Sequence, residues 1–370
     1  MKNFNLVDLN SNLDVLNFLP DWVKITSVNG VVIFANKPLV NKLNFDPQGM
    51  KIDDLKTTKF KEIFSVGIHP SDFKEDDMKK SDLKYDGKVY DVLTAPIRDD
   101  FGTITAYVDI YRDMTSLKNI QNEITFKNEI MNKDLTLTKK IQESILPVDL
   151  NFGRLKVDYM YLPCEQLSGD IFDVISINKN ITSAYICDVS GHGVPAAMVT
   201  VFVRETMRNL QDYHSSAYDL TELHRRFLDL RLDMSQYLTM FHVLIDTNEQ
   251  TISYSNAGHN CPMFLIRQND VIRIEMTGKP VCNYFEKIYF KEKVIRFNPG
   301  DKILLFTDGI KETQNKDGEE YGLDRVESII RTKPNDILKT LRRSLDYFNS
   351  GVRYDDMCAV LIEFKDKGDV

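Results

Sequence analysis

The chain has 370 residues, of which 42% are hydrophobic and 28% are charged, and its formal net charge is −8. This length predicts two or three domains, and the apolar content excludes a largely disordered protein. Charges of both signs are mixed along the chain, which argues against a broad surface for nucleic acid.

The sequence also argues against membrane insertion and secretion. No run approaches the roughly 20 apolar residues of a membrane helix, and the first residues carry acids and amides where a signal peptide needs an apolar core. The five cysteines are widely spaced and include no C-x-x-C pair, which disfavours a disulfide framework or a zinc site. We expect a cytoplasmic protein with reduced, mostly buried thiols and with no membrane or nucleic-acid partner.

Residues 12–113 have the pattern of short strands, loops and small helices, and we expect them to form one α/β domain. The turn Asn29-Gly30 lies between two apolar runs and predicts a β-hairpin. Two later runs alternate apolar and polar residues around residues 99–102 and predict a second antiparallel pair. The four expected strands are 22–26, 31–35, 88–97 and 103–111.

Residues 114–147 predict a helical linker, because they contain no glycine and no proline before Pro147 and repeat apolar residues at helical spacing. A seven-residue grid holds Leu117, Ile124, Met131, Thr138 and Ile145, with Gln121, Asn128, Leu135 and Gln142 at the other seam positions. So polar a seam is typical of a signalling coiled coil that changes register. A helix packed on its own domain is the alternative.

Residues 148–366 alternate strands and helices and form the third expected domain. The expected strands are 183–188, 238–246, 251–256, 302–307 and 358–363. The expected helices are 195–210, 220–233, 324–331 and 335–348. The whole chain is therefore assigned to the α+β class.

Aspartates in this third domain lie at the ends of apolar strands. Asp188 and Asp308 each follow an apolar run, Asp355-Asp356 leads into the last one, and Asp170 precedes the first. A charge at the rim of a core costs desolvation unless it is neutralised, and converging acids repel one another. All-oxygen ligands favour Mg²⁺ or Mn²⁺ over zinc, and paired ions of this kind hydrolyse phosphoesters.

Two other catalytic motifs are excluded by the residues themselves. A serine-hydrolase elbow around Ser190 would need glycine two places earlier, where the chain has Asp188. No dinucleotide fingerprint or P-loop occurs. Gly191 and Gly193 are better explained by backbone that passes close to a metal or a phosphate.

The acidic motifs together resemble the bacterial sporulation and stress-response branch of the PPM (protein phosphatase 2C-like) phosphatases, over about residues 140–365. The matching motifs are Gln142–Pro147, Ser168-Gly169-Asp170, Asp188–Ala197, Asn256–Asn260, Pro299-Gly300-Asp301, Thr307-Asp308-Gly309 with Glu312, and Asp355-Asp356-Met357. The resemblance implies an αββα sandwich of two antiparallel sheets flanked by helices, with two Mn²⁺ or Mg²⁺ ions at the sheet edge.

The resemblance also implies roles for single residues. Asp188 would bridge both ions, the Val189 carbonyl would add a ligand, and Asp308 and Asp355 would hold one ion each or share them. Asp170 would act through water or as an outer ligand. Asp188, Asp308 and Asp355 are thus the expected catalytic residues.

Two histidines and two departures from the family pattern bear on this assignment. His192 is either the group that protonates the leaving alkoxide or a surface residue, whereas His259 is expected to be structural. Ser168 replaces the first glycine of the usual Gly-Gly-Asp, and Cys358 replaces a common threonine. Neither departure removes a carboxylate, so we expect activity.

Residues 18–115 resemble a PAS domain, through the hairpin at Asn29-Gly30, Ala35-Asn36 and the exit at residues 111–115. No cysteine precedes Cys164, which excludes a flavin–cysteinyl light sensor, and His69, the only histidine there, is expected to be a loop residue rather than a haem ligand. The domain is expected to bind a small molecule or to dimerise.

The combined resemblance implies a metal-dependent serine/threonine protein phosphatase gated by a sensor. Its expected substrate is a phosphorylated anti-anti-sigma (STAS-type) regulator of a sigma-factor stress response, and a homodimer through sensor and linker is expected. A pseudophosphatase that binds a ligand and a partner without chemistry is the alternative. A nucleotide cyclase is disfavoured, because no Gly-Gly-Asp-Glu-Phe-like loop occurs.

Overall fold

The computed structural model describes residues 13–66, 78–148, 150–210, 215–268 and 270–366. The chain divides into two compact units, Met1–Met131 and Asn132–Val370. His69, which is expected from the sequence to be a loop residue rather than a haem ligand, lies outside the described residues. Within the described part of the chain, no helix is both long and apolar enough to cross a membrane.

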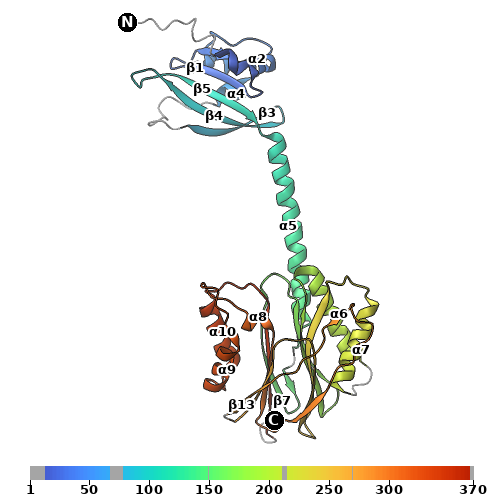
Figure 1. Cartoon of the computed structure of the whole chain (residues 1–370). Coiled ribbons are helices and arrows are strands. Elements are labelled where there is room, and N and C mark those ends of the chain that lie inside the picture. The colour runs from blue at the N-terminus through green and yellow to red at the C-terminus, as the bar shows by residue number, and fades with distance from the viewer. Residues whose placement is uncertain (1–12, 67–77, 149, 211–214, 269, 367–370) are drawn as a thin grey trace. The chain divides into compact units, whose positions relative to one another are not determined.

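The N-terminal unit is built on a five-stranded antiparallel sheet with the order β2-β1-β5-β4-β3 (Figure 1). Its strands are β1 (Trp22–Ser27), β2 (Val32–Ala35), β3 (Lys79–Tyr85), β4 (Lys88–Arg98) and β5 (Ile104–Asp113). Its short helices are η1 (Asp14–Phe18), α2 (Lys37–Leu43), α3 (Ile52–Leu55) and α4 (Lys61–Ser65). Both hairpins expected from the sequence are present, and Gly30 takes the positive φ of 75° that its turn requires.

Helices α2, α3 and α4 pack on one face of the sheet. Leu39 of α2 and Phe64 of α4 share a buried cluster with Val92 and Tyr111 of the sheet. Asn36 fixes the start of α2, because its side-chain oxygen accepts hydrogen bonds from the backbone amides of Val23 and Leu39 (2.9 and 3.3 Å).

The expected linker is one helix, α5 (Thr115–Ser144), which crosses the division between the two units. Exposed apolar side chains along it are Leu117, Ile120, Ile124, Phe126, Ile130, Met131, Leu137 and Ile141. The seven-residue grid is wrong at its C-terminal end. Gln142 is buried, and Ile145 packs against the core of the C-terminal unit, so neither residue is available to a seam.

The C-terminal unit contains two six-stranded sheets. The first, in the order β15-β11-β10-β9-β8 with β14 beside β10, comprises β8 (Asp170–Ser176), β9 (Ile181–Val189), β10 (Tyr237–Asp246), β11 (Thr251–Ala257), β14 (Val281–Cys282) and β15 (Lys293–Arg296). The second, in the order β13-β12-β16-β17-β7-β6, comprises β6 (Asn151–Phe152), β7 (Leu155–Leu162), β12 (Met263–Arg267), β13 (Asp270–Ile274), β16 (Lys302–Phe306) and β17 (Met357–Phe364).

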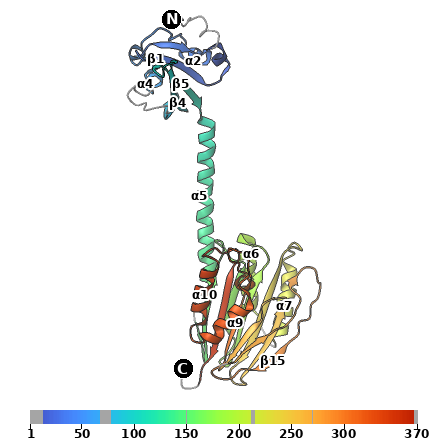
Figure 2. The ribbon, with the colours of Figure 1, turned by 60° about the vertical axis from the view of Figure 1, so that its left-hand side comes forward.

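The two sheets pack face to face, with helices outside each of them (Figures 1 and 2). Phe172, Ile186 and Phe241 of the first sheet share one buried cluster with Leu305 and Val360 of the second. Helices α6 (Gly193–Arg208) and α7 (Ser216–Asp229) cover the first sheet, and α9 (Gly322–Thr332) and α10 (Ile337–Phe348) cover the second. This is the αββα sandwich expected from the sequence.

A buried polar cluster lies where α7 packs on the first sheet. The Nδ1 of His242 is 3.3 Å from the carbonyl oxygen of Ser216, and its Nε2 is 2.9 Å from the hydroxyl of Ser183. A neutral ring that donates from Nδ1 and accepts at Nε2 satisfies both contacts. Asp219 lies 3.7 Å from Nε2, and its carboxyl oxygens have no hydrogen-bond partner among the described residues. Burial and the charge of Glu292 raise the pKa of Asp219 to about 7.

This raised pKa makes the C-terminal unit less stable as Asp219 ionises. The folded protein binds a proton at Asp219 that the unfolded chain has released, so this contribution to stability is complete below the unfolded pKa of 3.8 and is lost as pH rises to about 7. We expect Asp219→Asn to gain stability relative to the wild type by about 1.4 kcal/mol for each pH unit in that window. Urea unfolding at several pH values measures the difference. Asp229→Asn, an exposed acid on the same helix, is the control, and parallel pH profiles for Asp219→Asn and wild type would contradict the assignment.

Candidate active site

The first two acids of the site face each other across neighbouring strands. Asp170 of β8 is the register partner of Asp188 of β9, and like charges in directly opposite positions disfavour a sheet. Asp170 is buried and accepts a hydrogen bond from the Thr307 hydroxyl (2.6 Å). Burial and the charge of Asp188 raise the pKa of Asp170 well above its usual range. The same threonine oxygen accepts from the backbone amide of Cys358 (2.9 Å), so Thr307 ties the two sheets together at this edge.

Asp188 is the electrostatic centre of the acids. Its pKa is raised to about 7 by burial and by the charges of neighbouring carboxylates. Those neighbours are Asp308, Asp355, Asp356 and Glu312. Acids from separate parts of the sequence thus lie close enough to Asp188 to disfavour its ionised form. These acids therefore belong to one site.

Asp308 is the first residue of the short helix α8 (Asp308–Lys311), separated from strand β16 by Thr307 alone. The side-chain amide of Asn260 donates to its carboxylate (2.9 Å). The next residue must be glycine, because a Cβ on Gly309 would overlap the carbonyl oxygen of Asp356 and would lie 3.3 Å from the Cβ of Asp355. This close approach holds Asp308 beside the acids that precede β17.

The carboxylate of Asp356 is hydrogen-bonded to backbone amides. Its two carboxylate oxygens accept from the amides of Cys164 (2.8 Å) and Gly169 (2.7 Å). A Cβ on Gly169 would lie 2.8 Å from the carbonyl oxygen of Val189, so only glycine allows the loop to pass there. Asp356 therefore positions the loop that leads to Asp170, and it leaves Asp355 as the more exposed member of the pair.

The end of helix α5 holds the same loop from its other side. The Gln142 side chain accepts from the Ser168 amide (3.0 Å) and donates to the Ser168 carbonyl (2.7 Å) and the Thr200 hydroxyl of α6 (3.2 Å). Ser168 does not have a positive φ, and its hydroxyl accepts from the Asp170 amide (3.0 Å). Serine is thus accommodated where the family usually has glycine.

The two histidines of the motifs lie in different settings. His192 is exposed at the start of α6, 3.3 Å from a carboxylate oxygen of Glu165. His259 is buried, with Nε2 2.9 Å from the carbonyl oxygen of Phe306 and Nδ1 3.2 Å from the hydroxyl of Thr239. Burial lowers the pKa of His259, so it is a neutral bridge between the sheets.

The cysteines match the expectation of free, mostly buried thiols. All five are unpaired, and Cys187, Cys261, Cys282 and Cys358 are buried. Burial raises the pKa of Cys358 well above its usual range, so this replacement of threonine is an inert core thiol.

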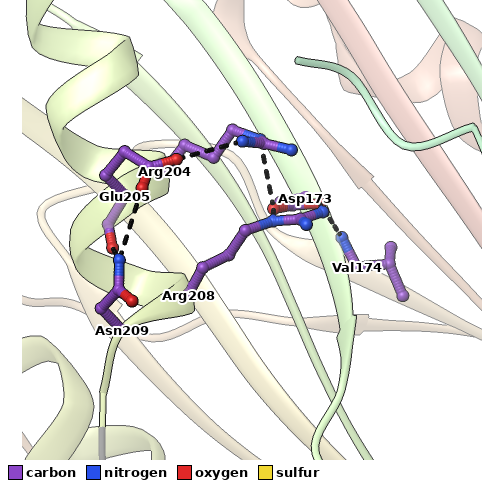
Figure 3. Close-up of polar contacts among 6 residues, drawn as sticks. All are labelled: Asp173, Val174, Arg204, Glu205, Arg208 and Asn209. Atoms are coloured by element: carbon purple, nitrogen blue, oxygen red, sulfur yellow. Dashed lines mark hydrogen bonds and ion pairs between the residues drawn. The ribbon is translucent and has the colours of Figure 1, made fainter.

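Another buried acid, Asp173, anchors α6 (Figure 3). Its side chain on β8 has no exposed surface, and it accepts two hydrogen bonds from Arg208, at 2.6 and 2.9 Å. Arg204 approaches the same carboxylate to 3.7 Å. Both arginines come from α6, the helix that begins directly after the Asp188–His192 loop, so this ion pair fixes the helix whose start lies at the site.

The donor chemistry of the site fits hard divalent cations, because the candidate donors at the acidic strand ends are carboxylate and backbone carbonyl oxygens. In the conformation described, however, no group of three or more His, Cys, Asp or Glu side chains is arranged to hold a metal ion within the residues covered. The ligand set is therefore argued below as a proposal.

The fold and the acidic strand ends define a PPM-type serine/threonine phosphatase. The family model described as Stage II sporulation protein E (SpoIIE) matches residues 179–365, and the chain belongs to this family. PPM phosphatases are metal-dependent enzymes that use Mn²⁺ or Mg²⁺.

Similar proteins agree with this assignment. Phosphoserine phosphatase RsbU of Bacillus subtilis is 26% identical over 69% of this chain and 75% of its own length. Phosphoserine phosphatase RsbP of the same organism is 25% identical over 63% of this chain, and the match covers 58% of its length. For the fold alone, the solved SiaA-PP2C domain of Pseudomonas aeruginosa superposes with a TM-score of 0.56 at 16% identity, over 65% of this chain and 99% of that one.

Proposed function

We propose that this phosphatase removes phosphate from phosphoserine or phosphothreonine on a STAS-type regulator protein in a partner-switching pathway of sigma-factor control. The observation that carries the proposal is the group of acids whose charges converge on Asp188. RsbU and RsbP, which share a quarter of their aligned residues with this chain, are both phosphoserine phosphatases, which supports this substrate class.

In this proposal, Asp188, Asp308 and Asp355 bind two Mn²⁺ or Mg²⁺ ions, with the Val189 carbonyl as a further ligand and Asp170 as an outer one. Such ions lower the pKa of a bound water and neutralise the phosphoryl oxygens. Asp188 would supply negative charge to the ions, and its cross-strand partner Asp170 accepts a hydrogen bond from the Thr307 hydroxyl (2.6 Å). Asn260 orients Asp308.

The remaining residues hold this arrangement rigid. Asp356 keeps the Gly169 amide and therefore the adjacent Val189 carbonyl in place. The buried His259 joins the β10 and β16 edges. Asn260 also lines a cavity of about 410 Å³ together with Glu275, Thr277 and Leu323, which offers space for polypeptide next to the phosphorylated residue.

The purified chain tests this function directly. With Mn²⁺ or Mg²⁺ it is expected to release phosphate from the organism's phosphorylated STAS proteins, and excess EDTA is expected to stop the release. If no phosphate is released and calorimetry detects no Mn²⁺ binding at millimolar concentration, the pseudophosphatase alternative takes the place of this proposal.

We further propose that the N-terminal unit is a PAS-like sensor that controls the phosphatase through α5, with two chains paired along that helix. The exposed apolar residues of α5 support a pairing surface. The bonds from Gln142 to Ser168 and Thr200 support control, because they join the end of the helix to the loop before Asp170. Comparing the activity of the full chain with that of residues 132–370 tests whether the N-terminal unit acts on the site.

The pairing surface yields a prediction at Asn128, which lies at a polar position of the seven-residue grid. Asn128→Leu is expected to stabilise one register of the paired helices and to shift basal activity, because a buried asparagine weakens such a seam. Light scattering and phosphate release measure the two effects. Asn132→Leu, the same exchange one turn along and off the grid, is the control. An unchanged oligomeric state and activity in Asn128→Leu would rule out a switching role.

A further inference from the structure

The inner face of the N-terminal sheet carries aromatic side chains at one end and polar side chains further along. At one end Trp22 stacks on Tyr90, with ring centroids 4.4 Å apart, and packs beside Tyr111. One register step along the same face, Lys24 of β1 pairs with Asp109 of β5, and Asp109 pairs with Thr94 of β4. The next step places Thr26 opposite Tyr107. If the apolar core continued along this face, the positions of Lys24, Asp109 and Thr26 would hold apolar residues.

The polar row is almost completely shielded from water. Lys24 and Asp109 are 1% and 3% exposed. Their Nζ and Oδ2 atoms are 2.5 Å apart, and the other carboxylate oxygen accepts from the Thr94 hydroxyl at 2.5 Å. A buried ion pair seldom stabilises a fold more than apolar residues of similar volume do, because both charges lose their hydration. Stability alone therefore does not explain this row.

A cavity lies over these residues. Its volume is about 300 Å³, and its walls include Val28, Ile52 and Phe64 together with the polar row. Thr26 is 7% exposed, and its hydroxyl has no hydrogen-bond partner among the described residues. A buried hydroxyl without a partner costs free energy unless something else bonds to it. The lining combines polar and apolar groups, and a cavity of this size with convergent polar groups is typical of small-molecule sites.

The charges around the cavity restrict its ligand. Lys24 is paired with Asp109 on the floor, and Lys56 is paired with Asp53 (3.2 Å) on the wall, so the lining has no net charge. Lys24 keeps further N–H donors, and Asp109 keeps acceptor capacity beside them. A ligand that complements this pair presents a carbonyl oxygen to Lys24 and an adjacent N–H to Asp109. A cis-amide group has these two atoms side by side. A carboxylate or a phosphate would instead face Asp109 without compensation.

We propose that this cavity binds a small uncharged lactam heterocycle of nucleobase size. Its carbonyl accepts from Lys24, its ring N–H donates to Asp109, and a second polar group bonds the Thr26 hydroxyl. The flat ring packs against Phe64. This proposal concerns the N-terminal unit alone and does not depend on the phosphatase activity.

The test uses the full chain and two lactams, uracil and hypoxanthine, followed by calorimetry and by thermal unfolding. At least one of them is expected to bind and to raise the unfolding temperature, whereas benzoate and toluene, an anion and a hydrocarbon of similar size, are not. Thr26→Val keeps the shape and removes the hydroxyl, and we expect it to weaken binding about tenfold. Thr105→Val, on the exposed part of β5, is the matched control and is expected to bind as the wild type does.

A second variant keeps the test decisive if Thr26→Val does not fold. The double exchange Lys24→Met with Asp109→Leu removes both charges at similar volume, so the unit is expected to remain folded and to lose lactam binding. Failure of both lactams to bind the wild type at millimolar concentration would overturn the proposal. So would tighter binding of benzoate, or lactam binding that survives in the double variant.

Discussion

Replacing Asp188 by asparagine is expected to lower phosphate release by at least about a thousandfold at saturating metal, because the exchange removes the charge on which the other acids converge. Asparagine has the same shape and keeps one oxygen, so a loss of this size reports the charge rather than the packing. The measurement is phosphate release from a phosphoserine protein in Mn²⁺, with Mn²⁺ binding followed separately by calorimetry.

A second readout separates a catalytic role from simple damage to the fold. Burial and neighbouring carboxylates disfavour ionised Asp188, so the metal-free variant is expected to be at least as stable as the metal-free wild type, in urea with EDTA. Asp158→Asn, an exposed acid on β7, is the control and is expected to leave both properties unchanged. Substantial activity in Asp188→Asn would remove this residue from the proposed site, and loss of activity together with unfolding would assign it a structural role.

The elements of the C-terminal unit were predictable because their patterns are local. Apolar strands ending in an acid predicted β9 and β16, which the structure places at Ile181–Val189 and Lys302–Phe306. The sequence shows that glycine follows Asp308, but it does not show why glycine is needed there. Only the folded chain shows that the carbonyl of Asp356 occupies the space that a side chain on Gly309 would need.

Contacts between distant residues were the part that the sequence did not predict. Gln142 was assigned to a helix seam because its spacing fits the grid, whereas its amide bonds Ser168, 26 positions away. Thr307 and Asn260 stood within the recognised motifs, but nothing in one sequence says that they bond Asp170 and Asp308. A polar residue on an otherwise regular repeat is equally compatible with a seam and with a buried clamp, and burial decides between them.

The buried polar row of the N-terminal unit illustrates the same limit. Lys24 and Thr26 lie within a strand that reads as ordinary alternation, and Asp109 is 85 positions from Lys24. The turn at Asn29-Gly30 predicted the hairpin that contains this strand, but it did not predict which of its residues are buried. In the structure Lys24 and Thr26 share the inner face with Trp22, because the register of β1 with β5 puts all three against the helices.

Asp173 carries the largest expected effect on stability. Its carboxylate is fully buried against Arg208 and Arg204 of α6 (Figure 3), so Asp173→Asn removes the buried counter-charge that both arginines share, although Arg204 keeps its pair with Glu205 (3.3 Å). Removing one partner of a buried pair typically costs 3–5 kcal/mol. Because the Arg208 side chain is 37% exposed and can reach water, we expect a loss of about 2–4 kcal/mol.

The design of the measurement uses the single tryptophan of the chain, Trp22, which lies in the N-terminal unit. Far-UV circular dichroism in urea follows both units, while Trp22 fluorescence reports the N-terminal one, so only the circular dichroism transition is expected to shift in Asp173→Asn. Asp346→Asn breaks a half-exposed pair with Arg353 and is expected to cost less than Asp173→Asn, about 1 kcal/mol. The double variant Asp173→Leu with Arg208→Leu removes the pair as a unit and is expected to recover part of the loss. If Asp173→Asn costs no more than Asp346→Asn, the buried pair does not anchor α6.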